Sequence, residues 1–423
     1  MDKLEEQKLK SVRQQLDRLY REQTGKMLAY LVSLLSDLSL AEEVWHETIE
    51  KALCQWIDET PEHPKAWLAT VARNAALDRL RHKKLSLDKI RLIQALSTEE
   101  NSEFDIDAYQ FPDQQLKLIF TCCHPAVAFE NQVALTLHSV CGLTTDQIAQ
   151  ALLLSRSTLE QRMTRAKRKI KLSNIPFVIP PEKDIEDRLE AVLQVIYLVF
   201  SAGFNDERDA MLPEVDLCQE ATRLAKLVSE LTANDSKKSC EAKGLLALMM
   251  FTLARRAARF DEQGNIVLLE QQNRSLWDWA MIEEADQILS ETLAQKHVGI
   301  YQIQAAITGV HSLAKSSEQT DWLHIEALYS LLLQLDSSPV IRLNSAVATA
   351  FARGYEMGLQ KISQLEEQGD LAQYASLYSA KADLLRRLEC HREAIGYYEK
   401  AISLSHAKKE IDYYQQQIEL LRR

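Results

Sequence analysis

The sequence predicts an all-α protein, and three observations support this. Apolar residues recur at three- and four-residue steps, as at Leu28, Leu31, Leu35 and Leu38, which is the spacing of an amphipathic helix. The 423 residues include only 11 Gly and 9 Pro, few for a protein built on turns. The sequence contains no Asn-Gly or Asp-Gly pair, so the strongest short-range signal for a β-hairpin is absent.

Composition is that of an ordinary globular protein, with 46% apolar and 26% charged residues. Transmembrane helices need roughly 18 or more uncharged apolar residues in a row, and no stretch approaches that length. The first ten residues are charged throughout and lack the apolar core of an export signal. We therefore expect a cytoplasmic protein without membrane contact, whose seven cysteines are reduced thiols.

Charge is distributed unevenly along the chain. Residues 1–176 hold 24 basic and 24 acidic residues, whereas residues 177–423 hold 26 basic and 37 acidic residues and so carry the whole net charge of −11. Overall acidity therefore does not exclude nucleic-acid binding by the first part of the chain.

Two segments interrupt the helical periodicity. Residues 99–113 contain six acids, and no basic residue occurs between Arg91 and Lys117, which predicts an acidic linker over residues 96–112. The prolines between Asn174 and Pro181 predict a second break, because consecutive prolines lack backbone donors and end helices.

Residues 142–171 have the pattern of a helix-turn-helix. Thr144 with Gln147, and Ser157 with Glu160, each fit the capping box that opens a helix, and a short turn around Ser155 joins the two expected helices. The second helix has an apolar stripe for the core, which consists of Leu159, Met163, Ala166 and Ile170.

The other side of this second helix is basic, with seven basic residues and one acid between Arg156 and Lys171. Such a helix can enter the major groove of DNA, with polar residues at its N-terminal end against base edges and later basic residues against phosphates. The residues expected to contact DNA here are Arg156, Ser157, Thr158, Gln161, Arg162, Arg165, Arg168 and Lys169. A solvent-exposed basic face on a purely structural helix is the alternative interpretation.

A second basic cluster at residues 73–91 follows Trp67, and aromatic residues beside basic ones suit unstacked bases and their phosphates. Residues 36–62, just before it, hold eight acids and one lysine. The alternative here is an acidic helix beside a basic one, whose charges simply neutralise each other.

Both clusters resemble a known family. The segment from Asp37 to Glu47, followed by that from Trp67 to Arg81, resembles region 2 of bacterial sigma factors of the sigma-70 family, and residues 113–171 resemble region 4. Region 3 is missing, as in the extracytoplasmic-function type. The Thr-Cys-Cys-His-Pro stretch from Thr121, together with segments of the long extension such as those from Gly244, Arg342 and Ala382, resembles the subgroup with a tetratricopeptide-like C-terminal domain.

This resemblance implies a domain order: region 2 at residues 1–95, the acidic linker at 96–112, region 4 at 113–176, a subgroup-specific helical domain at 182–335 and tetratricopeptide-like repeats at 336–423. It also implies two partners, core RNA polymerase and promoter DNA. The acids expected to bind core polymerase are Asp37, Glu42, Glu43 and Glu47. The residues expected to contact the downstream promoter element are His63, Trp67, Arg73, Asn74, Arg79, Arg81 and Lys83.

The last part of the chain contains a weak internal repeat of small residues. Ala382, Ala394 and Ala401 are spaced 12 and 7 apart, and Ala346 and Gly358 repeat the 12-residue step. Small residues at these positions let paired helices approach closely, as in tetratricopeptide units. An ordinary helical bundle with chance alanines is the alternative.

A metal site and an enzymatic activity both have little support in the sequence. Cys122, Cys123, His124, His138 and Cys141 invite a metal site, but adjacent cysteines are poorly spaced ligands and no Cys-x-x-Cys pair occurs, so buried thiols are preferred. Motifs for phosphate loops, dinucleotide binding or hydrolysis are absent, so we expect no enzyme and no cofactor.

Three functions stay open at this stage. A sigma factor is favoured. The alternatives are a helix-turn-helix regulator with a tetratricopeptide interaction arm and no polymerase contact, and a helical enzyme with an unrecognised site. The acidic stretch at residues 37–50 separates the first two, because a simple regulator does not need it. We expect the C-terminal extension to have a protein or ligand partner of its own.

Overall fold

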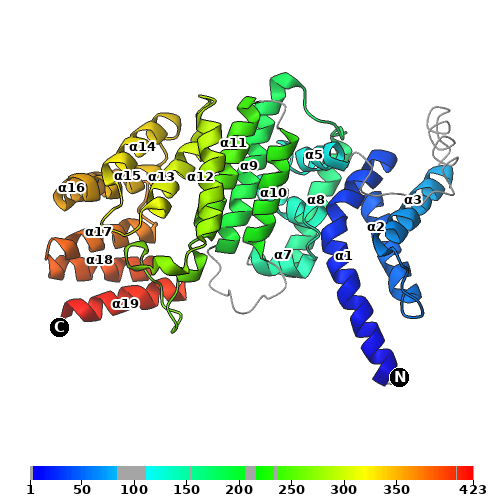
Figure 1. The fold of residues 1–423 in the computed structure, drawn as a ribbon, viewed down its shortest axis with the longest axis horizontal. Coiled ribbons are helices and arrows are strands. Elements are labelled where there is room, and N and C mark those ends of the chain that lie inside the picture. Colours follow the sequence, from blue (N-terminus) through cyan, green and yellow to red (C-terminus); the bar gives the residue numbers. More distant parts are fainter. Residues whose placement is uncertain are drawn as a thin grey trace. The chain divides into compact units, whose positions relative to one another are not determined.

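The structure is a computed structural model that describes residues 3–82, 111–152, 154–204, 216–232, 236–405 and 407–422. Within these ranges the regular structure is helical, with an isolated antiparallel bridge between Phe260 and Ile266 and no β-strand (Figure 1). The prediction of an all-α protein is therefore confirmed. The chain divides into two compact units: residues 1–206 with 213–227, and residues 207–212 with 228–423.

The first unit begins with three helices that pack on one another: α1 (Lys3–Leu35), α2 (Leu38–Gln55) and α3 (Pro64–His82). The predicted stripe of leucines crosses a helix break, because Ser36 has a positive φ of 55° and ends α1. Asp37 then caps α2: its Oδ1 accepts hydrogen bonds from the backbone N–H groups of Ser39 (3.0 Å) and Leu40 (3.2 Å). Leu38 is thus the first residue of α2.

A second group of helices follows in the same unit. It consists of α5 (Phe111–Cys122), α6 (Phe129–Leu135), the π-helical turn η1 (Thr136–Val140), α7 (Thr145–Ala151) and α8 (Arg156–Leu172). α5 and η1 pack against α1, which joins this group to the first three helices. Residues 96–110 of the predicted acidic linker lie outside the described residues, whereas Phe111 already belongs to α5.

The proline-containing break is present as predicted: α8 ends at Leu172 and α9 (Glu182–Phe204) begins after Pro181. α9 packs on α5 and α6, and the Arg188 guanidinium donates to the backbone carbonyl of Phe120. The sequence predicts that the next domain begins at residue 182, whereas α9 and most of α10 (Leu217–Leu231) pack within the first compact unit.

The second unit is a succession of helices in which sequence neighbours pack together (Figure 1). Short 3-10 turns, η2 (Arg256–Ala258), η3 (Leu269–Gln271) and η4 (Arg274–Leu276), lie between its first two helices. The helices are α11 (Ser236–Leu253), α12 (Trp279–Leu293), α13 (Ile300–Leu313), α14 (Trp322–Leu335), α15 (Pro339–Arg353), α16 (Tyr355–Gln368), α17 (Ala375–Arg387), α18 (His391–Leu404) and α19 (Lys408–Arg422).

Small residues lie where these helices come closest, as the repeat pattern predicts. A Cβ at Gly358 on α16 would overlap the Cβ of Ala350 on α15 and would lie 2.9 Å from the carbonyl oxygen of Ala346. Ala382 on α17 and Ala394 on α18 are fully buried. The last helices of the chain thus pack as pairs whose spacing depends on side chains of minimal size.

None of the helices in the described ranges combines the length and the apolar character that a membrane span needs.

Candidate functional site

α7, a short turn and α8 form the predicted helix-turn-helix. The first capping box is confirmed: Thr144 N–H donates to Gln147 Oε1 (2.9 Å), and Gln147 N–H donates to Thr144 Oγ1 (3.3 Å). The second predicted box is wrong. α8 begins two residues earlier, with Ser155 as its N-cap, and Ser155 Oγ accepts from Thr158 N–H at 3.1 Å. Ser157 therefore lies inside the first turn of α8 instead of capping it.

α8 has the two faces that the sequence predicts. Leu159, Met163, Ala166 and Ile170 are all buried and face the core of the first unit. Of the predicted DNA contacts, Ser157, Thr158, Gln161, Arg165, Arg168 and Lys169 are exposed, and Arg162 is partly exposed. Arg156 is also exposed.

The exposed basic residues of α8 differ in their partners. Arg156 forms ion pairs with Asp146 on α7 (3.0 Å) and with Glu160 one turn later (2.8 Å), so its charge is compensated and it ties the two helices together. Arg162, Arg165, Arg168 and Lys169, in contrast, have no ion pair with any residue in the described part of the chain. Four uncompensated cations on one side of a helix produce a positive surface suited to phosphates.

Two further lysines of α8 contact α2 instead of solvent. The Lys167 ammonium donates to Glu42 Oε2, and Lys171 Nζ lies 2.7 Å from Asp37 Oδ2. Glu42 Oε1 also accepts a hydrogen bond from Ser139 Oγ at 3.2 Å. The acidic helix and the helix-turn-helix are therefore joined by ion pairs within the first unit.

Glu42 lies inside this contact, with only 8% of its side chain exposed. His138 Nε2 lies 3.7 Å from Glu42 Oε1, and His138 Nδ1 lies 3.0 Å from the Leu143 carbonyl oxygen. Burial lowers the pKa of His138, although the charge of Glu42 opposes this. The imidazole is therefore neutral at pH 7 and Lys167 is the cationic partner of Glu42.

Asp37 has a double role at the start of α2. Burial raises the pKa of its carboxyl, but the hydrogen bond from Lys171 and those from the backbone N–H groups of Leu40 and Ser39 outweigh burial, so the pKa lies below its usual value. The carboxylate stays ionised while it caps α2 and holds α8.

The other two acids of the predicted polymerase-binding set face α3. Arg79 donates to Glu43 Oε1 at 3.1 Å and to Glu47 Oε1. Arg79 is one of the residues expected to contact DNA. Its ion pairs, however, are those expected if the acidic and basic helices neutralise each other. In this arrangement all four predicted acids form ion pairs with basic residues of the same chain.

The predicted downstream DNA contacts that the structure describes lie along α3 and directly before it. His63 and Asn74 are exposed, and Trp67 packs edge-on against Trp56 with ring centroids 5.5 Å apart. Arg81 is exposed and pairs with Asp78 at 3.1 Å. Arg73 is buried, with 4% exposed, so its side chain is not at the surface that the prediction places it on. Lys83 lies outside the described residues.

Sequence reasoning missed the contact between α2 and α8. The sequence assigns Glu42 to polymerase binding, yet Glu42 lies four residues after Leu38 and three before Trp45, which are both buried. That spacing was a signal that Glu42 faces inward. Its partners Ser139 and Lys167 are about a hundred residues further along the chain, and no local pattern identifies them.

Cys122, Cys123 and Cys141, which the metal interpretation would use as ligands, are all buried. Burial raises the pKa of both Cys123 and Cys141 to about 12, so these thiols are protonated at neutral pH. Cys123 Sγ lies 3.6 Å from Thr136 Oγ1. Among the described residues, His, Cys, Asp and Glu side chains form no group of three that could hold a metal ion.

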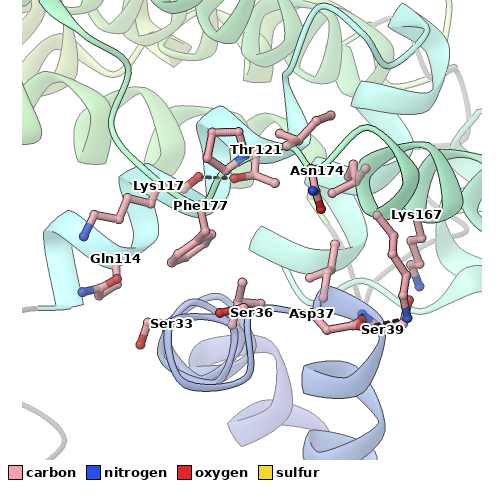
Figure 2. A pocket seen from close by; sticks show the side chains of 16 residues that line it. Ser33, Ser36, Asp37, Ser39, Gln114, Lys117, Thr121, Lys167, Asn174 and Phe177 are labelled. Atoms are coloured by element: carbon pink, nitrogen blue, oxygen red, sulfur yellow. Dashed lines mark hydrogen bonds and ion pairs between the residues drawn. The ribbon is translucent and has the colours of Figure 1, made fainter. Parts of the chain in front are cut away.

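A cavity of about 710 Å³ adjoins the contact between α2 and α8 (Figure 2). The end of α1 and the start of α2 form one wall, and α5, the end of α8 and residues 174–177 form the other. Polar side chains such as Ser33, Gln114 and Lys117 and apolar ones such as Phe177 line it together.

Three family profiles match the chain. The profile for Sigma-70 region 2 matches residues 19–85, which cover the second half of α1 and all of α2 and α3. The profile for Sigma-70 region 4 matches residues 118–170, which cover the helix-turn-helix except for the last two residues of α8. The chain belongs to the sigma-70 family. It is a sigma factor like those of the extracytoplasmic-function type, with a C-terminal extension, as the resemblance implies.

The extension of this sigma factor matches a family of unknown function, DUF6596, over residues 188–293. An uncharacterized protein, R00370, of Rhizobium meliloti (strain 1021) is 37% identical over 401 residues, which span 94% of this chain and 92% of that protein. No solved structure matches the chain. The similarity to the Rhizobium meliloti protein therefore covers regions 2 and 4 as well as the extension.

Proposed function

We propose that this sigma factor brings core RNA polymerase to promoters through two DNA-binding surfaces, one on α8 and one on α3. The observation that carries the proposal is the outer side of α8, where Arg162, Arg165, Arg168 and Lys169 have no ion-pair partner among the described residues. A structural helix would need no such surface, since uncompensated like charges repel each other. In this proposal α8 enters the major groove of the upstream promoter element.

The downstream element is assigned to α3 and the loop before it. Asn74 and His63 are exposed, and we assign them to bases. Arg81, which is exposed and pairs with Asp78, is assigned to a phosphate. Trp67 is partly exposed beside Trp56, and we assign it the stacking of an unstacked base. Arg73 is buried, and we assign it the support of α3 and no direct contact with DNA.

Core polymerase binding is assigned to α2. Glu43 and Glu47 are the more accessible acids, whereas Asp37 and Glu42 are held by Lys171 and Lys167 of α8. Docking of the whole acidic set on polymerase therefore requires α8 to leave α2. Separation of the two regions also suits a protein that binds two spaced stretches of one DNA.

A helix-turn-helix regulator without polymerase contact is the competing function. Reconstitution of the full chain with bacterial core RNA polymerase and a library of promoter sequences separates the two. We expect transcripts from a small set of sequences, and none from the same library without the chain. DNA binding by the chain alone, with no co-purification of core polymerase, would favour the competing function.

For the extension we propose regulation in cis or a protein partner of its own. Its net charge of −11 over residues 177–423 disfavours direct contact with DNA, and its paired helices are of a kind that binds proteins. Removal of everything after Pro180 would delete α9, which belongs to the first unit, so a truncation there tests folding as well. A protease site between α10 and α11, cut after folding, is the better experiment. Transcription that is equal before and after cleavage would contradict regulation in cis.

A further inference from the structure

The cavity next to the α2–α8 contact has the size of a small-molecule site. Its volume of about 710 Å³ falls within the range of roughly 300–1,000 Å³ that is usual for ligand pockets. Its walls come from two parts of the sequence: residues 32–39 of region 2, and residues 114–121 and 167–177 on the region 4 side. The cavity therefore exists only while the two regions are packed together.

Among the residues that the structure describes, the charges around the cavity leave one cation without a counter-charge. Lys171 pairs with Asp37 and Lys167 pairs with Glu42. Lys117, in the middle of α5, has no ion pair with any described residue, and Figure 2 shows its side chain extended along the wall. The excess of one positive charge suits a ligand with one negative charge.

The other residues that line the cavity indicate which further groups a ligand would carry besides its anionic group. Gln114 Oε1 is buried and has no hydrogen-bond partner in the described part of the chain, so it is available to accept from a donor on a ligand. Ser33, Ser36 and Ser39 supply hydroxyl groups along the opposite wall. The ring of Phe177 points into the space between α5 and α1 in Figure 2 and offers an apolar face.

We propose that this cavity binds a small aromatic or aliphatic molecule with one anionic group, and that the bound molecule holds regions 2 and 4 together. Lys117 pairs with the anionic group, Gln114 accepts from a donor on the ligand, and Phe177 covers the apolar part. The regulatory half of this inference rests on the proposed function, because it requires that polymerase binds the separated form. A ligand that binds only the closed form lowers the apparent affinity for polymerase in proportion to its own occupancy.

The probe is 8-anilinonaphthalene-1-sulfonate, an aromatic monoanion with an N–H donor, and its fluorescence is titrated on the full chain. N-phenyl-1-naphthylamine, the same frame without the sulfonate, serves as the neutral comparison. Lys117→Gln should weaken binding of the anionic probe about fivefold or more and leave the neutral probe unchanged, since it removes one charge-assisted contact. Phe177→Ala should weaken both. Lys10→Gln, at an exposed position in the first half of α1, is the matched control and should change neither.

Equal binding of the anionic probe by Lys117→Gln and the unaltered chain would overturn the site. The second measurement is the affinity of the chain for core polymerase, with and without the probe. At a probe concentration ten times its dissociation constant, apparent polymerase affinity should fall about tenfold for the unaltered chain, and Lys117→Gln should lose most of this response. Lys117-dependent probe binding with unchanged polymerase affinity would overturn the regulatory half alone. Failure of the probe-free chain to bind polymerase would instead contradict the proposed function.

Discussion

Glu42 on α2 accepts a hydrogen bond from the ammonium of Lys167 on α8, across 125 positions of sequence. The Glu42 side chain is 8% exposed and that of Lys167 is 19% exposed, so this ion pair is largely removed from solvent. Ser139 Oγ supplies a second hydrogen bond to the same carboxylate. A single buried acid thus links α2, the helix expected to bind polymerase, to α8, the helix expected to bind the upstream promoter element.

The first prediction concerns this pair. Glu42→Gln leaves Lys167 without its counter-charge, and Lys167→Gln does the same to Glu42, so each should lower the free energy of unfolding of the first unit by about 3 kcal/mol. The double variant should lose less than the sum of the two, with a coupling energy of about 1 kcal/mol or more. Urea unfolding at pH 7 measures all three variants.

Lys169→Gln provides the control, because Lys169 is an exposed neighbour on α8 that forms no ion pair with any described residue. Its effect should stay within about 0.5 kcal/mol. Strict additivity of the two single changes would show that Glu42 and Lys167 do not interact in solution.

The second prediction separates two arginines of α8. Arg162 lies nearer the N-terminal end of the helix, where side chains reach base edges, and Arg165 lies one turn later. Arg162→Ala should weaken binding of the holoenzyme to its promoter by about 1–3 kcal/mol and relax the choice of base at one position. Arg165→Ala should weaken binding to all sequences alike and reduce the salt dependence by about one phosphate contact.

Footprinting of the upstream element over a series of salt concentrations measures both effects. Full protection by both variants at every salt concentration would refute the placement of α8 on DNA.

The third prediction uses two glycines in neighbouring helix pairs. Gly358 on α16 touches α15, and a Cβ there would overlap Ala350, whereas a Cβ at Gly396 on α18 meets nothing within 4 Å. Alanine is the better helix former at both places by about 1 kcal/mol. Gly396→Ala should therefore stabilise the second unit by up to about 1 kcal/mol, and Gly358→Ala should destabilise it by about 1–3 kcal/mol because the helices must move apart.

Thermal unfolding of the two single variants tests whether one substitution raises and the other lowers the stability of the second unit. Stabilisation by both would mean that α15 and α16 do not approach closely at Gly358.

Local patterns were sufficient for the helix-turn-helix and for the paired helices, but not for the surface around α2. A capping residue bonds to a residue three positions away, and the apolar residues of a helix stripe recur every three or four positions. Such short-range patterns made Thr144, Gln147 and the apolar stripe of α8 recognisable from the sequence. Arg73, which is predicted to contact DNA, is buried, and its spacing indicates this: it lies four residues after Ala69 and seven before Leu80, and both are buried.

Partners far apart in sequence could not be predicted at all. Lys171 and Asp37 are separated by 134 positions, and their contact depends on how α8 packs against α2. Each charge taken alone was equally consistent with DNA, polymerase or solvent as its partner. A single sequence contains no information that decides among these, because pairing at that distance is a property of the folded core.

The last prediction concerns a histidine of the second unit. Burial, together with the charges of Arg255 and Arg274, lowers the pKa of His311 from 6.5 to about 4. The unfolded chain therefore binds a proton between about pH 6.5 and pH 4 that the folded unit does not bind. The contribution of His311 to stability is complete above pH 6.5 and is lost as the pH falls towards 4, by about 3 kcal/mol in all.

Hydrogen exchange of peptides from α13 and α14 at a series of pH values measures this loss, because His311 packs edge-on against Trp322 of α14 with ring centroids 5.0 Å apart. Exchange rates are corrected for their intrinsic pH dependence. His311→Asn cannot be protonated and should remove most of the pH dependence of protection in these two helices. His297→Asn, at an exposed position, is the control and should leave it intact. An unchanged pH profile in His311→Asn would show that other groups of the second unit bind the proton.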